Sequence, residues 1–97
     1  MEIPEGLTRE DLVDQYDHVA RLRCAPEIRL GFVYHRLELA FVALEGGRTD
    51  RVAELRAQAF LLSLSDEDFS AFEAEVSVER AHNANLTVVG GPFERAS

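Results

Sequence analysis

The side chains best suited to chemistry in this sequence are Glu79 and His82, which frame the run Glu-Arg-Ala-His. In a helix this E-x-x-H spacing puts the carboxylate and the imidazole on one side, as in di-iron carboxylate bundles. An inward carboxylate such as Glu38 would have to complete the site across a dimer. The chain holds no second E-x-x-H pair, and the motif falls where the predicted fourth helix ends, so its ligands would be poorly held. We therefore expect no bound metal, and a metal-binding, ferritin-like helical protein is kept as an alternative.

The other histidines and the single cysteine indicate structural roles. His18 lies near Asp14 on the polar face of a predicted helix, which favours a solvated side chain. His35 lies on an otherwise apolar face beside Phe32, which favours a hydrogen-bonded histidine at a packed interface. Cys24 stands alone, which excludes a disulfide or a thiolate zinc cluster within one chain.

Motifs of known catalytic mechanisms are missing from the sequence. It has no G-x-S-x-G, no H-E-x-x-H and no glycine-rich phosphate loop. The run from Gly46 to Thr49 is typical of a helix C-cap followed by the N-cap of the next helix, with Thr49 as the capping residue. We therefore predict a protein without enzymatic activity, catalytic residues or cofactor.

Length and charge limit the class of protein and partner. The chain has 97 residues, 46% of them hydrophobic, and a formal net charge of −8, with arginine as its only strongly basic residue type. These values fit one acidic domain and disfavour direct binding to nucleic acid or an anionic membrane. Neither a signal peptide nor an apolar run of about 20 residues is recognisable. We expect a cytoplasmic protein, and a basic protein surface would suit it as a partner.

Hydrophobic periodicity and capping signals predict four helices. The first begins after Thr8, whose spacing to Asp11 resembles a capping box. The second covers Pro26–Glu45, the third Asp50–Leu64, and the fourth begins after Ser65 and ends near Arg80 or Ala81. The domain organisation is then a helical domain over 1–85 and a C-terminal tail over 86–97, which opens with a β-prone run. The fold class is all-α: a small antiparallel bundle of four helices with a flexible or docking tail, completed by dimerisation.

The second helix is the most informative element because it is apolar on two opposite sides. One face carries Ile28, Phe32, Leu39, Val42 and Ala43, and the other carries Leu30, Val33, Tyr34, Leu37, Ala40, Phe41 and Leu44. Two polar seams separate these faces, one with Arg29 and Arg36, the other with Glu27, Glu38 and Glu45. A peripheral helix normally buries a single stripe, so two faces need cover from the chain itself on both sides or from a second chain on one. The fourth helix offers only a thin apolar stripe, Phe69, Phe72 and Val76, so we predict a homodimer.

These patterns lead to a predicted function of protein association. We expect a non-enzymatic helical interaction module, such as a small adaptor, inhibitor or assembly subunit, that acts as a homo-oligomer. An acidic inhibitor that mimics nucleic acid is a second alternative. The predicted interface residues are Ile28, Phe32, His35, Leu37, Leu39, Phe41, Val42 and Leu62. The predicted acidic docking surface consists of Asp66, Glu67, Asp68, Glu73, Glu75 and Glu79.

Overall fold

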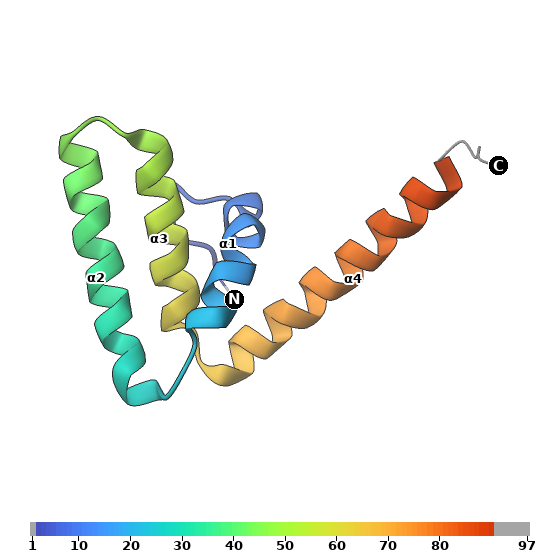
Figure 1. Cartoon of the computed structure of the whole chain (residues 1–97), viewed down its shortest axis with the longest axis horizontal. Helices are drawn as coiled ribbons and strands as arrows, with labels where there is room; N and C mark the ends of the chain where they lie inside the picture. Colours follow the sequence, from blue (N-terminus) through green and yellow to red (C-terminus); the bar gives the residue numbers. More distant parts are fainter. Residues whose placement is uncertain (1, 91–97) are drawn as a thin grey trace.

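The computed structural model describes residues 2–90 and contains four helices and no strand in that range. They are α1 (Arg9–Leu22), α2 (Pro26–Glu45), α3 (Thr49–Ser63) and α4 (Asp66–Gly90). Figure 1 shows α1, α2 and α3 side by side with α3 in the middle, while α4 begins near the end of α3 and its C-terminal end projects away from the other three. The prediction of an all-α fold with four helices is confirmed.

The helix starts follow the capping chemistry of the sequence at two of the predicted places. The Thr8 hydroxyl accepts from the backbone N–H of Asp11 (3.1 Å), and the Asp11 carboxylate accepts from the N–H of Thr8 (2.9 Å), which completes a capping box. The Ser65 hydroxyl accepts from the N–H of Asp68 in the same way (3.1 Å). Thr49, in contrast, is the first residue of α3 and makes no capping hydrogen bond, so its predicted role was wrong.

The core surrounds α3, which is buried over much of its circumference. Its buried residues are Leu55, Ala57, Gln58, Ala59, Leu61 and Leu62. The side chains packed around them include Leu12, Tyr16 and Val19 of α1 and Phe69, Phe72 and Val76 of α4. The predicted apolar stripe of the fourth helix, Phe69, Phe72 and Val76, is therefore confirmed as buried.

The fourth helix is longer than the sequence predicted. It was expected to end near Ala81, yet α4 continues through Asn83 to Gly90, so the predicted β-prone run 86–89 is helical. Asparagine is only a weak helix breaker, and a continuing helix supplies each peptide with a partner four residues away. The rest of the predicted tail, 91–97, lies outside the described residues. In the described part of the chain, no helix combines the length and apolarity needed to cross a membrane.

Candidate interaction surface

Most of the large hydrophobic side chains that are exposed among the described residues belong to α2. Among the described residues, the one exposed large hydrophobic side chain outside α2 is Val78, on α4. Monomeric proteins rarely leave so many neighbouring apolar groups in water, so this helix is the candidate interaction surface. The eight on α2 are Ile28, Leu30, Tyr34, Leu37, Leu39, Phe41, Val42 and Leu44.

The side of α2 that packs against the rest of the chain is the one that carries two arginines. The Arg36 Nε donates to the side-chain oxygen of Gln58 in α3 (3.0 Å), and the Arg29 Nη2 donates to the backbone carbonyl of Cys24 (3.0 Å). Ala40 and Ala43 are buried on the same side, where their small side chains let α3 come close. The prediction that the Arg29 and Arg36 seam merely separates two buried faces was wrong. The chain covers this seam because an arginine can bury its stem while its guanidinium stays hydrogen-bonded. The two apolar faces of α2 lie on either side of the seam and extend past the part that the chain covers.

One of the two apolar faces that flank this seam carries a regular apolar row, which we call the α2 stripe. It consists of Leu30, Tyr34, Leu37, Phe41 and Leu44, which are 46–64% exposed. Their spacing alternates between four and three residues, the heptad spacing of helices that pack along one another. At one edge the stripe meets a shallow, mainly apolar groove of about 300 Å³ lined by residues that include Leu7, Val33, Leu37 and Phe60.

The predicted interface residues lie in three different environments. Ile28, Leu37, Leu39, Phe41 and Val42 are exposed large hydrophobics, and His35 is exposed too. Phe32 is half-buried and packs against the core. Leu62 is fully buried inside the core of its own chain, so its assignment to an interface was wrong. Leu30, Tyr34 and Leu44 were omitted from the predicted interface, although their heptad spacing with Leu37 and Phe41 could have identified them.

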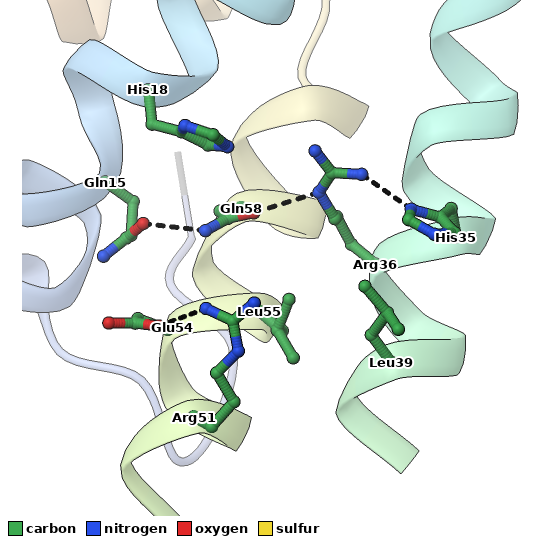
Figure 2. A pocket seen from close by; sticks show the side chains of 9 residues that line it. All are labelled: Gln15, His18, His35, Arg36, Leu39, Arg51, Glu54, Leu55 and Gln58. Carbon is green, nitrogen blue, oxygen red and sulfur yellow. Dashed lines mark hydrogen bonds and ion pairs between the residues drawn. The ribbon is translucent and has the colours of Figure 1, made fainter. Parts of the chain in front are cut away.

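His35 lies at the rim of a pocket between α1, α2 and α3, which we call the three-helix pocket (Figure 2). Its volume is about 410 Å³. The Gln58 side chain, on a residue only 6% exposed, accepts from Arg36 and donates to the Gln15 side-chain oxygen (2.9 Å). The Arg36 Nη1 lies 2.7 Å from the His35 Nδ1. His18, predicted as a solvated histidine of α1, lines the same pocket.

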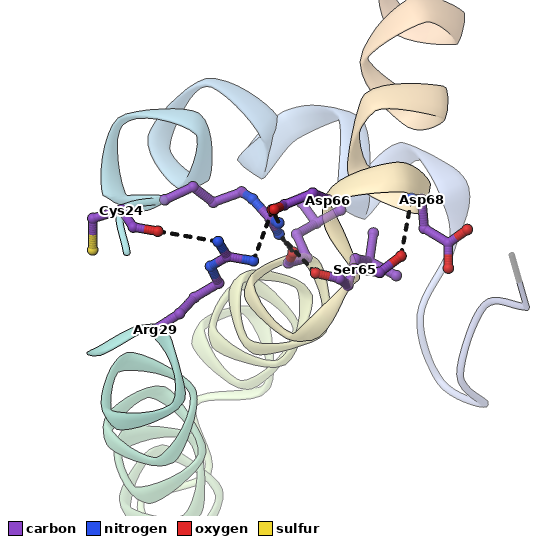
Figure 3. A network of polar contacts seen from close by, with 8 residues as sticks. Cys24, Arg29, Ser65, Asp66 and Asp68 are labelled. Atoms are coloured by element: carbon purple, nitrogen blue, oxygen red, sulfur yellow. Dashed lines mark hydrogen bonds and ion pairs between the residues drawn. The ribbon is translucent and has the colours of Figure 1, made fainter. Parts of the chain in front are cut away.

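The beginning of α4 is fixed by a network of arginines around Asp66 (Figure 3). The Asp66 carboxylate accepts from Arg23 (2.7 Å) and pairs with Arg29 (3.1 Å). The hydrogen bond from Arg23, as the larger cause, and the positive charge of Arg29 together lower the pKa of Asp66 below its usual range. Arg23 also donates to the carbonyls of Leu61 and Leu64 (3.0 Å each), so it satisfies the end of α3.

Other members of the predicted acidic docking surface also have partners within the chain. Glu73 accepts from the Tyr16 hydroxyl (2.6 Å), and both Glu75 (3.1 Å) and Glu79 pair with Arg9. Glu67 and Asp68 make no ion pair among the described residues. Four of the six predicted carboxylates therefore hold α4 to the body of the protein, through α1 or through Arg23 and Arg29.

The E-x-x-H pair Glu79 and His82, which the sequence left as an alternative metal site, is not joined by further ligands in the described part of the chain. There, no group of three or more histidine, cysteine, aspartate or glutamate side chains could hold a metal ion. Glu79 is paired with Arg9, and His82 is exposed on the projecting part of α4. Cys24 is exposed and carries a free thiol.

Comparison with known proteins yields no assignment. No family model, no curated protein and no solved structure matches the chain. The α2 stripe and the pockets of the chain itself are therefore the basis for inferring a function.

Proposed function

We propose that this protein is a non-enzymatic helical interaction module, an adaptor, inhibitor or assembly subunit, that works as a homodimer through the α2 stripe. The observation that carries this proposal is the exposure of five large apolar side chains in heptad spacing on one helix. Burial of apolar surface contributes about 25 cal/mol per Å², so covering this row would stabilise an assembly. A second chain would also complete a bundle in which α2 is now covered on one side.

The order of side chains along the α2 stripe supports a second copy as the partner. It reads leucine, aromatic, leucine, aromatic, leucine in either direction, with Leu37 in the middle. In a twofold interface the same surface patch serves both subunits, so it must complement itself. Two copies of α2 that run in opposite directions would present the same series of side-chain types to each other over about 20 Å.

An aspartate at the centre of the stripe tests the proposal. Leu37→Asp would place two unpaired carboxylates inside the proposed contact, at a high cost in desolvation. We expect wild-type protein to sediment as a dimer and Leu37→Asp as a monomer with unchanged helical circular dichroism. The matched control is Val78→Asp, which adds the same charge to an exposed apolar position on α4 and should leave the dimer intact. A wild-type protein that stays monomeric at every concentration, or a fully dimeric Leu37→Asp, would overturn the proposal.

A further inference from the structure

The three-helix pocket gathers hydrogen-bond donors in a strongly acidic protein. Arg36 and His35 of α2, Arg51 of α3 and His18 of α1 all line it. Its single carboxylate, Glu54, accepts from Arg51 (2.6 Å), so its charge is already matched. The local balance of charge in the pocket is thus opposite to the net charge of −8 of the whole chain.

Arg36 is held in place by buried groups rather than by solvent. Its Nε donates to the side-chain oxygen of the buried Gln58, which is fixed in turn by Gln15. Its guanidinium carbon lies over the Phe32 ring, 5.9 Å from the ring centre. A guanidinium placed in this way loses little conformational freedom when it binds a ligand, which favours affinity.

Donors remain available around this fixed guanidinium. The hydrogen bonds that Arg36 makes to described residues use two of its five N–H groups. Because a guanidinium can only donate, the Nδ1 of His35 must accept, which puts the ring proton of neutral His35 on Nε2 as a further donor. Figure 2 shows His18 extending from α1 into the same space as Arg36.

Acidic groups define which part of the pocket can take an anion. Asp11, Asp14 and Asp50 line a neighbouring depression that shares Gln15 and Glu54 with the three-helix pocket. An anion would be repelled from that end and attracted to the end formed by Arg36 and His35. His18 of α1 lines the pocket together with Arg36 and His35 of α2, so the donors come from two helices and approach a ligand from different directions.

We propose that the three-helix pocket is a binding site for a phosphate group, either inorganic phosphate or the phosphate of a small monoester. A phosphate offers several acceptor oxygens in a tetrahedral arrangement, which suits donors from several helices, and it pairs with a planar guanidinium through two parallel hydrogen bonds. The pocket volume of about 410 Å³ leaves room for a small organic group beside the phosphate. The site is separate from the α2 stripe and does not depend on dimerisation.

Titration of the full-length protein with inorganic phosphate, followed by nuclear magnetic resonance at constant ionic strength, tests the proposal. Sodium chloride is the reference salt, and glycerol 3-phosphate is the monoester probe. We expect saturable shifts of the His35, His18 and Arg36 side-chain signals with phosphate or the monoester, and none with chloride. The probe that binds more tightly identifies the source of the phosphate group. Non-saturable shifts, or equal shifts with chloride, would overturn the proposal.

Two variants assign the binding to the pocket. Arg36→Met keeps an unbranched apolar stem and removes the guanidinium, so it should weaken binding by at least about tenfold. Arg51→Gln lies at an exposed position, leaves the Gln58 contacts intact and should weaken binding severalfold, which provides a test if Arg36→Met unfolds. Arg48→Met removes an exposed arginine outside the pocket and serves as the matched control with unchanged binding. Saturable binding that persists undiminished in Arg36→Met or, should that variant unfold, in Arg51→Gln would contradict the proposed site.

Discussion

Tyr16 shows how single residues connect α1 to α4. Its ring stacks on Phe69 with 5.5 Å between ring centres and meets Phe72 edge-on at 6.1 Å. Its hydroxyl donates to Glu73 at 2.6 Å, so the polar end of a buried ring is satisfied. The sequence places Tyr16 at helical spacing from Leu12 and Val19, on one apolar stripe of α1. It could not identify Glu73 as the partner, because the two residues are 57 positions apart.

The contact between Tyr16 and Glu73 makes stability depend on pH in alkaline solution. Burial, as the larger cause, and the hydrogen bond to Glu73 together raise the pKa of Tyr16 to about 12. A tyrosine in the unfolded chain has a pKa of about 10. The stabilising contribution is therefore complete below pH about 10 and is lost as the pH rises to about 12. Urea unfolding at increasing pH should show this loss of stability in the wild type. In Tyr16→Phe the free energy of unfolding should fall less steeply with pH.

Tyr34→Phe is the control for this alkaline effect. Tyr34 makes no hydrogen bond within the described residues, and phenylalanine keeps its apolar ring in the α2 stripe, so this replacement should preserve the loss of stability at high pH. If the free energy of unfolding fell equally steeply with pH in the wild type and in Tyr16→Phe, the Tyr16 hydroxyl would not determine the pH dependence of stability.

At the scale of elements, two glycines of the α2 region have opposite requirements. Gly31 lies inside the helix, and apart from its two neighbours and the adjacent backbone of α2, no atom of the described chain lies within 4 Å of the place where a Cβ would stand. Gly47 follows the helix with a φ of +73°, a left-handed conformation that L-residues with side chains adopt only at a cost.

Replacing each glycine by alanine should therefore change stability in opposite directions. Gly31→Ala should raise the free energy of unfolding by about 0.5–1 kcal/mol, because alanine is the better helix former. Gly47→Ala should lower it by about 1 kcal/mol. Urea unfolding at one fixed protein concentration measures both. A destabilised Gly31→Ala would contradict the open space beside Gly31 and indicate a neighbouring chain in contact there.

The boundaries and environments of the helices could be predicted only in part. Thr8, Ser65 and Pro26 identified three helix starts, because capping and proline geometry are local. The end of α4 was missed, since the two asparagines near it do not force a helix to stop. The angular positions of the residues around the helix axis distinguished the faces of α2. They could not show that the seam with the two arginines packs against α3. The small buried residues Ala40 and Ala43 are the signal that favours this side.

Across the whole fold, the acidic groups of α4 are largely paired within the chain, and the exposed apolar groups lie mainly on α2. The acidic helix was predicted as a docking surface, yet four of its six named carboxylates bind partners inside the chain. These partners are distant in sequence, so composition alone could not reveal them. The exposed apolar surface is concentrated instead on α2, at the opposite side of the fold from α4 (Figure 1).

In the proposed homodimer, a second copy of the chain covers the α2 stripe. An isotope-filtered nuclear Overhauser experiment on a mixture of ¹³C-labelled and unlabelled protein detects contacts between chains directly. We predict intermolecular signals that connect the methyl groups of Leu30, Leu37 and Leu44 with one another and with the rings of Tyr34 and Phe41. A protein that shows no intermolecular signals, or only signals from α4, would contradict the claim.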